Sequence, residues 1–541
     1  MYNNYRKIIA AVFFVLMLCM APGLQAQEMQ QLSAPDAPAP DENYFDVLEF
    51  RVIGNTVLPS AEIEEAVYPW MGGRKSIADV EKARASLENA YHKAGYLTVL
   101  VDIPEQDVKQ GVVRLNVTEG KVERLRVNGS RYYSLGFIKA QAASLAEGKV
   151  PYFPDVQNDI ASLNRTADRR VTPVMKAGRT FGTVDVDLKV EDNLPLHASL
   201  EMNDQHSKGT ERWRLAGMLR YDNLWQRDHS LTLQFQTAPQ NTDQVKVLSA
   251  SYLGRFNDSD RMLAVYGVKS KSDIATVGGI NVLGNGNILG ARLILPLPAL
   301  KDYYHTLSFG ADYKSFEENI LFGADTTKTP ISYLSSAVQY SATAQDAKGV
   351  TQYGLGMNFG VRGVVGTDDE FKVKRVGAKS NFLVIKPELQ RTQTLPQDFQ
   401  LWGKLDGQFT SGPLISNEQY VAGGANSVRG YKEAEAAGDH ALHASLELRS
   451  PVLRRGEWLQ ELRLVGFYDA ATLHVLDATA SERGQHTIAG AGLGLSLKAR
   501  RNWNASVAVA RALHDASMLY SDTSGTRSGK VAGHVRLWYE F

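Results

Sequence analysis

The stretch V-A-G-G-A-N-S-V-R-G-Y, from Val421 to Tyr431, is the segment from which we predict the fold. It lies between two segments, Phe399–Phe409 and Leu442–Leu448, in which apolar and polar residues alternate as in the strands of a β-barrel. Its glycines permit backbone angles that residues with side chains avoid. We therefore expect a long loop at a barrel rim that folds back and carries Arg429 into the lumen, where a cation needs a fixed carboxylate partner.

The alternation extends over residues 194–541, for example in Leu307–Lys314 and Tyr353–Val361. Strands with one apolar and one polar face, and no second layer to cover the apolar face, are typical of a barrel with lipid outside and water inside. A soluble β-sandwich also alternates, so the alternation alone leaves that alternative open. Residues 195–541 accommodate roughly sixteen spanning antiparallel strands of about ten residues with their turns and loops.

The end of the glycine-rich stretch resembles the V-R-G-Y signature in the sixth extracellular loop of outer-membrane assembly and secretion barrels, the superfamily whose soluble parts are POTRA domains. The matching residues are Val428, Arg429, Gly430 and Tyr431. By this resemblance, the loop arginine pairs with an aspartate of a barrel strand. The alternative is an ordinary glycine-rich surface loop with a solvated arginine.

The expected partner lies in the strand Glu461–Asp469. Phe467-Tyr468-Asp469 is similar to the F-x-D-x-G element of the superfamily, except that Ala471 replaces the glycine. Alternate strand residues share a face, so Phe467 and Asp469 point into the lumen if Tyr468 faces lipid. We hypothesise that the pair of Arg429 with Asp469 is a lock that sets the conformation competent for transport.

The chain ends in a strand in which apolar residues alternate with polar ones and with Trp538, and its last residue is aromatic. This pattern resembles the C-terminal recognition strand of bacterial outer-membrane barrels. The resemblance implies that Tyr539 and Phe541 are recognised by the barrel assembly machinery during biogenesis.

Residues 45–120 are predicted to form a compact α+β module, and residues 121–193 repeat its β-α-α-β-β order. This order resembles a POTRA domain, and the alternative is one α+β domain of another kind. The predicted helices are Pro59–Tyr68, Ser76–Ala94, Leu135–Ala146 and Asp155–Thr166; the predicted strands are 47–53, Leu97–Ile103, Val112–Val117, Val122–Val127, Val171–Lys176 and Thr183–Val190.

Residues 1–26 are predicted to be a secretory signal peptide, because Arg6 and Lys7 precede a short apolar run. The single cysteine, Cys19, lies in that run, so we expect no disulfide and no thiolate metal site in the mature chain. Residues 27–44 are rich in proline and predict a flexible tether without a helix that plugs the barrel. No later apolar stretch is long enough for a transmembrane helix.

Lysine plus arginine and aspartate plus glutamate both number 59, which does not indicate a nucleic-acid-binding surface. We find no nucleophile elbow G-x-S-x-G, and Gly284–Asn287 is not followed by a phosphate-loop lysine. His440 and His443 are expected on opposite faces of a strand, so a shared metal is not predicted. The sequence therefore predicts a protein without catalytic residues, cofactor or metal.

Two POTRA-like modules ahead of roughly sixteen barrel strands resemble the two-partner secretion transporters of the haemolysin secretion and activation type. The resemblance implies a bacterial outer-membrane barrel whose periplasmic modules bind a large unfolded exoprotein, which then passes through the barrel. Outer-membrane lipid is a further implied partner. One alternative is an assembly factor that inserts other barrels, although such relatives usually carry more POTRA modules. The other is a porin, which needs no such modules, or a nutrient receptor, which has a large plug.

Overall fold

The computed structural model describes residues 44–108, 110–256, 260–272, 274–277, 280–317, 319–322, 325–455, 457–500, 502–517 and 524–541. The predicted signal peptide and the predicted tether up to residue 43 lie outside the described residues, as does the expectation that no plug helix is present. The chain divides into two compact units. The first holds the residues up to Lys121 with 150–154 and 177–184, and the second holds 122–149, 155–176 and 185–541. Within the described ranges, no helix is both long and apolar enough to span a membrane.

The first POTRA-like module is built around a three-stranded sheet of order β2-β5-β4. Apolar residues of α3, among them Leu87 and Tyr91, pack with Leu115 of β5 in one hydrophobic cluster. The N–H of Ser76 donates to Asp79 Oδ2 at 3.0 Å at the start of α3, and this bond holds the pKa of Asp79 below its usual value. The elements are β1 (Phe45–Val47), β2 (Glu49–Ile53), α2 (Ser60–Val67), η1 (Tyr68–Trp70), β3 (Gly72–Lys75), α3 (Ile77–Lys93), β4 (Val99–Asp102) and β5 (Val112–Glu119).

The second POTRA-like module repeats this arrangement with a sheet of order β6-β8-β7. Gly54 and Gly129 hold equivalent places in the two modules, with φ of 96° and 93°, and a Cβ on either would collide with the carbonyl oxygen of Val117 or Val190. The elements are β6 (Lys121–Asn128), α4 (Leu135–Gln141), η2 (Ala143–Leu145), α5 (Phe153–Leu163), β7 (Arg169–Ala177) and β8 (Thr183–Asp192).

Three predicted elements differ in the structure. The strand expected over 47–53 is interrupted at Leu48, because the N–H groups of Leu48 and Glu49 both donate to the carbonyl of Gly111, at 2.7 and 3.1 Å. β1 consequently pairs with β3, a short strand that was not predicted. The helix expected over 135–146 ends at Gln141, and the single 3-10 turn η2 follows it. The next helix, α5, begins at Phe153, two residues earlier than predicted.

The closed barrel contains the expected sixteen antiparallel strands, and β31 pairs with β9 to close it. The three-residue β27 (Leu453–Arg455) is an additional short pairing on β28. The sixteen strands are β9 (Leu196–Asn203), β10 (Arg214–Leu224), β11 (His229–Thr237), β12 (Lys246–Arg255), β13 (Met262–Lys271), β16 (Gly286–Pro296), β17 (Tyr303–Phe316), β20 (Ile331–Asp346), β21 (Gly349–Gly360), β22 (Leu383–Thr394), β23 (Gln400–Thr410), β26 (His440–Arg449), β28 (Leu459–His474), β29 (Gln485–Ala499), β30 (Trp503–Ala512) and β31 (Val531–Glu540).

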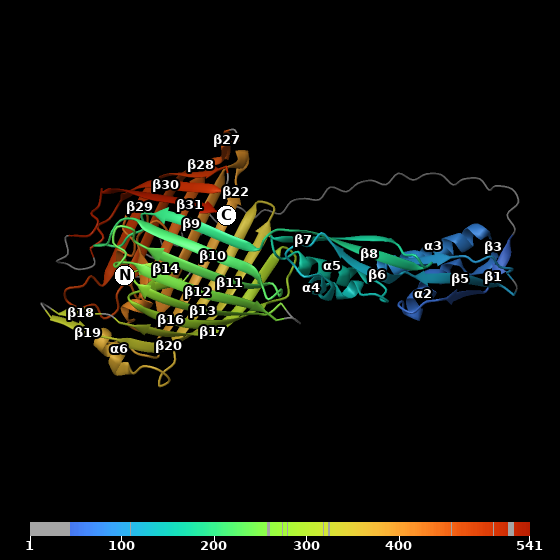
Figure 1. Ribbon diagram of the computed structural model, residues 1–541, viewed down its shortest axis with the longest axis horizontal. Helices are drawn as coiled ribbons and strands as arrows, with labels where there is room; N and C mark the ends of the chain where they lie inside the picture. Colours follow the sequence, from blue (N-terminus) through green and yellow to red (C-terminus); the bar gives the residue numbers. More distant parts are fainter. Residues whose placement is uncertain are drawn as a thin grey trace. The chain divides into compact units, whose positions relative to one another are not determined.

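Side chains alternate around the barrel wall as expected for a lipid-facing exterior. Leu248 and Leu289 are each 60% exposed, whereas their strand neighbours Val247 and Ile288 are buried inside. Short turns connect the strands at one end of the barrel, which we call the turn end, and longer connections lie at the opposite loop end (Figure 1). The short turn after β22 contains η3 (Pro396–Asp398). The longer connections contain β14 (Ile274–Val277), β15 (Ile280–Leu283), β18 (Asn319–Phe322), β19 (Asp325–Lys328), α6 (Asp368–Lys374), η4 (Ser416–Glu418), β24 (Tyr420–Ala422) and β25 (Ala436–Gly438).

The Leu87→Ala substitution is expected to destabilise the first module by about 2–5 kcal/mol, because Leu87 is fully buried and its removal leaves a cavity. Hydrogen exchange of the α3 amides in the purified full-length protein measures this loss. Glu65→Ala, at an exposed position of α2, is the control and should leave the exchange unchanged. Equal protection of α3 in Leu87→Ala and in the unsubstituted protein would contradict the expected packing.

Candidate functional site

The connection between β23 and β26 turns inward and brings Val421–Tyr431 against the inner wall of the barrel. Gly423, Gly424 and Gly430 have φ values of 110°, 104° and 100°, which side-chain-bearing residues rarely adopt. Gly430 also lies so close to β30 that a Cβ would sit 3.1 Å from the backbone nitrogen of Ala512. Glycine is therefore required where the loop reverses and where it touches the wall.

Arg429 forms a bidentate ion pair with Asp469 of β28. Its Nε lies 2.7 Å from Asp469 Oδ2 and its Nη2 lies 2.8 Å from Oδ1. The backbone N–H of Arg429 also donates to Oδ2, at 3.1 Å. The Asp469 side chain is 0% exposed and the Arg429 side chain 12%. Paired charge-assisted bonds are strong, and the removal of one partner would leave the other charge buried and uncompensated.

Four further side chains surround this pair. Arg429 Nη1 donates to Glu447 Oε1 at 2.7 Å, and the hydroxyl of Ser445 donates to Asp469 Oδ1 at 2.6 Å. The Cζ of Arg429 lies 3.5 Å from the centre of the Phe467 ring, a cation–π contact. Glu447 also accepts a bond from Arg449 Nη2 at 2.6 Å. Two arginines thus balance two carboxylates, so the inward charges compensate each other.

The other residues of the motif anchor the loop to the remaining strands of this side of the barrel. Gly430 N–H donates to His534 Nε2 of β31 at 3.0 Å. The Tyr431 hydroxyl lies 2.9 Å from the carbonyl oxygen of Ala489 and accepts a bond from the N–H of His514 at 3.1 Å. Val428 is fully buried and belongs to the same hydrophobic cluster as Tyr431. The four-residue motif therefore contacts the wall from β28 to β31.

Gly490 of β29 leaves space on the barrel wall for the backbone of this loop. A Cβ at that position would overlap the carbonyl group of Arg429. The absence of a side chain at Gly490 lets the loop backbone approach the strand closely, which sets the depth at which Arg429 meets Asp469.

Tyr539 and Phe541 lie where the last strand ends at the turn end of the barrel. The Tyr539 ring is 4.8 Å from that of Trp503 and 4.5 Å from that of Phe541. The N–H of Phe541 donates to the carbonyl of Ala198 of β9 at 2.8 Å, and its side chain is 68% exposed. The chain end thus forms an exposed aromatic group beside the strand pair that closes the barrel.

The second module is joined to the turn end of the barrel by a buried arginine that sequence reasoning missed. Arg169 has a side chain 1% exposed and pairs with Asp228, in the turn after β10, through bonds of 2.8 and 3.0 Å. Its guanidinium also lies 4.5 Å from the ring centre of Tyr133. Burial raises the pKa of Tyr133 to about 12, so this ring stays neutral. The pair was not predictable, because nothing in the local pattern connects residues 169 and 228.

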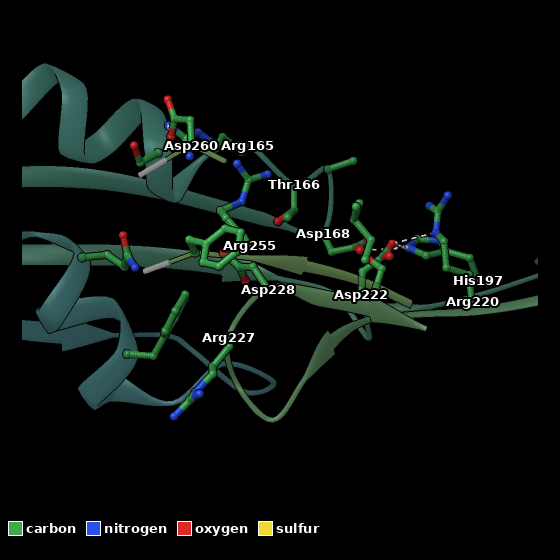
Figure 2. A pocket seen from close by; sticks show the side chains of 17 residues that line it. Arg165, Thr166, Asp168, His197, Arg220, Asp222, Arg227, Asp228, Arg255 and Asp260 are labelled. Atoms are coloured by element: carbon green, nitrogen blue, oxygen red, sulfur yellow. Dashed lines mark hydrogen bonds and ion pairs between the residues drawn. The ribbon is translucent and has the colours of Figure 1, made fainter. Parts of the chain in front are cut away.

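A cavity of about 510 Å³ lies beside this joint and is lined by arginines, aspartates and His197 (Figure 2). His197 Nε2 is 2.8 Å from Asp168 Oδ2 and 3.4 Å from Asp222 Oδ2. Asp222 Oδ2 also accepts a bond from Arg220 Nε at 2.8 Å. Among the described residues, Asp168, His197 and Asp222 are the one group whose three potential metal ligands lie within 4.8 Å of one another. Because Arg220 already compensates Asp222, we assign the contact of His197 with Asp168 to hydrogen bonding between the second module and the barrel.

Two partners in the candidate site were also missed at the sequence level. Ser445 and Glu447 both lie on the inward face of β26. Their spacing of two residues predicts a common face. What was not visible is the register of β26 on β28, which places Ser445 opposite Asp469 and Glu447 opposite Phe467. The contact of Gly430 with His534 joins residues far apart in the chain and had no local signal.

Comparison with known families identifies two matching family models. The model described as haemolysin secretion/activation protein ShlB/FhaC/HecB matches residues 182–497. The model described as POTRA domain, ShlB-type, matches residues 45–120. The first match covers more than half of the chain. It includes the four side chains that contact the Arg429 guanidinium, which are those of Ser445, Glu447, Phe467 and Asp469.

Characterised relatives extend the similarity along most of the chain. The heme/hemopexin transporter protein HuxB of Haemophilus influenzae is 21% identical over 491 residues, which cover 87% of this chain and 84% of that protein. The outer membrane transporter CdiB of Dickeya dadantii is 22% identical over 458 residues, covering 78% of this chain and 76% of that protein.

Solved structures share the fold. CdiB from Escherichia coli has a TM-score of 0.63 at 18% sequence identity, covering 94% of this chain and 93% of that chain. BamA from Haemophilus ducreyi lacking POTRA domains 1-3 has a TM-score of 0.54 at 13% identity, covering 92% of this chain and 100% of that chain.

The Gly490→Ala substitution is expected to push the loop away from the wall, because the added methyl group would occupy the place of the Arg429 carbonyl. Trypsin cleavage after Arg429 or Lys432 in the folded, detergent-purified protein should then become about tenfold faster or more, because a displaced loop is more accessible to the protease. Gly466→Ala on β28 is the control, because its nearest contact would be an ordinary 3.7 Å to Leu493. Cleavage of Gly490→Ala at the unsubstituted rate would contradict this account of the loop.

Proposed function

The chain belongs to the haemolysin secretion/activation protein family ShlB/FhaC/HecB. On this basis we propose a mechanism by which it acts as an outer-membrane transporter in two-partner secretion. It acts with a secreted exoprotein, which the POTRA domains bind in the periplasm and which passes through the barrel. The loop end of the barrel faces outward and the turn end faces the periplasm. Family members are transporters rather than enzymes, and we propose that this chain likewise has no catalytic role.

The pair of Arg429 with Asp469 is the observation that carries the proposed mechanism. It holds the glycine-rich loop inside the lumen, with bonds from one arginine to strands β26 and β28. In this proposal the pair is the lock that sets the transport-competent position of the loop. Separation of a buried ion pair costs a large amount of free energy, so the loop has one preferred position, and transport begins from that position.

The client is proposed to bind by adding a strand to an edge of a POTRA sheet. In the first module, β4 and β2 are the edge strands. The outer edge of β4 already bonds to α3, because Val101 N–H donates to Glu88 Oε2 at 3.1 Å and the Val101 carbonyl accepts from Arg84 Nη1 at 3.1 Å. A client strand that adds at β4 would replace these two side-chain bonds with backbone bonds.

We propose outer-membrane lipid and the barrel assembly machinery as the further partners. The exposed leucines of the strands, such as Leu289 and Leu355, form an apolar outer surface that suits lipid. The exposed aromatic chain end at Phe541 is the part offered to the assembly machinery. Folding of the exported client outside the cell would make its return unfavourable and so supply a direction to transport.

The likeness to BamA supports the fold and leaves assembly of other barrels as the second candidate function. Deletion of the gene separates the two. Loss of one large exoprotein from the cell surface and medium, with other barrels unchanged, is expected for a secretion transporter. A general loss of outer-membrane barrels would instead favour assembly.

Arg429→Ala is expected to leave a folded barrel in the outer membrane but to lower export of the exoprotein about tenfold or more, because it leaves Asp469 buried without its cation. Arg429→Lys keeps the charge but loses the bidentate geometry, so an intermediate export level is expected. Immunoblots of medium and cell fractions, with heat-modifiable migration as the test of folding, measure both effects.

The matched control is Arg500→Ala, which removes an arginine from an exposed pair with Glu457 at 3.3 Å and should export normally. Export by Arg429→Ala at the level of this control would refute the lock.

A further inference from the structure

An apolar cluster lies against the inner wall at the loop end of the barrel, on the side away from the Arg429 pair. Inward-facing residues of the wall, including Ile288, Phe316 and Tyr333, supply part of this cluster. The rest comes from the connections, including Phe371 of α6 and Leu414 before η4. A wet transport channel has no need of an apolar core at its mouth, so this cluster is a separate closing element.

The connection 361–382 forms the cap of this cluster. Thr367 begins α6, where its hydroxyl accepts a bond from the N–H of Glu370 at 3.3 Å. Ser380 closes the connection on itself through bonds to Asp368 at 2.6 and 3.0 Å. Phe371 is 1% exposed, with its ring 5.4 Å from that of Tyr333. The cap is thus a folded unit beside β20 at the loop end (Figure 1), and it packs Phe371 against the inward-facing Tyr333.

Arg375, directly after α6, ties the cap to a second buried aspartate. Its Nη1 and Nη2 lie 2.7 Å each from the two carboxylate oxygens of Asp439. The Asp439 side chain is 0% exposed and the Arg375 side chain 18%. Arg375 also donates to the carbonyl oxygens of Leu414 and Leu476, at 2.8 Å each. The N–H groups of these two leucines donate back to Asp439, at 3.0 and 2.7 Å.

Three outer connections therefore meet at one ion pair. Leu414 and Asp439 belong to the same connection as Arg429, and Leu476 belongs to the connection after β28, the strand of Asp469. Asp439 follows directly on β25, the returning strand of the inward hairpin. The cap is thus bonded directly to the connection that carries the loop motif.

We propose that Arg375 and Asp439 form an outer latch, which keeps the mouth closed while the transporter rests and couples the cap to the inserted loop. The inference rests on the proposed transport function. A polypeptide passing outward has to displace the apolar cap, and the cap is held by the paired bonds of Arg375. Release of the latch frees the cap while Arg429 stays paired with Asp469.

Conductance of the purified full-length protein in planar lipid bilayers tests the latch without a client. Arg375→Ala should raise the open probability about tenfold or more, since it leaves Asp439 buried without its cation. Asp439→Asn loses the charge and keeps an oxygen acceptor for only one of the amides of Leu414 and Leu476, and should have a similar effect. The double variant should open no more than either single variant, because both substitutions break the same pair.

Lys372→Ala is the matched control, because it removes a cation of α6 whose pair with Asp369 is exposed. An open probability of folded Arg375→Ala equal to that of Lys372→Ala would overturn the latch, as would effects of the two single substitutions that multiply in the double variant. If Arg375→Ala fails to fold, Arg375→Lys carries the test with a smaller expected increase, and an unchanged open probability would again overturn the proposal.

Export assays separate this proposal from the proposed transport function. Arg375→Ala is expected to export the exoprotein at the unsubstituted level or above, whereas Arg429→Ala is not. A closed pore together with lost export in Arg375→Ala would show a supporting role for Arg375 and would overturn the latch. Normal export by Arg429→Ala would count against the lock and leave the conductance result on the latch intact.

Discussion

The buried pair of Arg429 with Asp469 is the constraint on which the arrangement of the barrel interior depends. It ties a long connection to an inward-facing strand residue and leaves neither charge exposed. The surrounding residues serve the pair: Glu447 and Arg449 complete the charge balance, and Gly490 gives room for the loop backbone. A polar interior can hold such charges only where each meets a partner, and the loop position follows from that requirement.

Two different kinds of contact hold the long connections on two sides of the loop end. On the side of β28 to β31, the inserted loop is held by charges and backbone contacts. On the opposite side, from β12 to β22, the cap is held by apolar packing around Phe371 and Tyr333. Asp439 lies between them, bonded to Arg375 of the cap and continuous with the inserted connection. The two sides are also joined by packing, because Leu414 and Ile415 of the inserted connection belong to the apolar cluster of the cap.

The fold was largely predictable because two-residue alternation is a local pattern and shows which face of each strand meets lipid. It indicated the sixteen strands and the side on which Asp469 lies. The cap was not predicted, because Asp368–Lys374 is a short charged segment whose one buried aromatic residue gives no periodic signal. The contact of Arg169 with Asp228 and that of Gly430 with His534 depend on how distant segments meet, which no local pattern encodes.

The anchoring of Arg169 has a mechanical consequence. Its guanidinium is stacked within the second module and bonded to the turn after β10, and β10 is the direct neighbour of β9, which closes the barrel against β31. A load applied to the second module by a client under tension would therefore reach the barrel at β9 and at the turns after β10 and β12, next to the strand pair that closes the barrel.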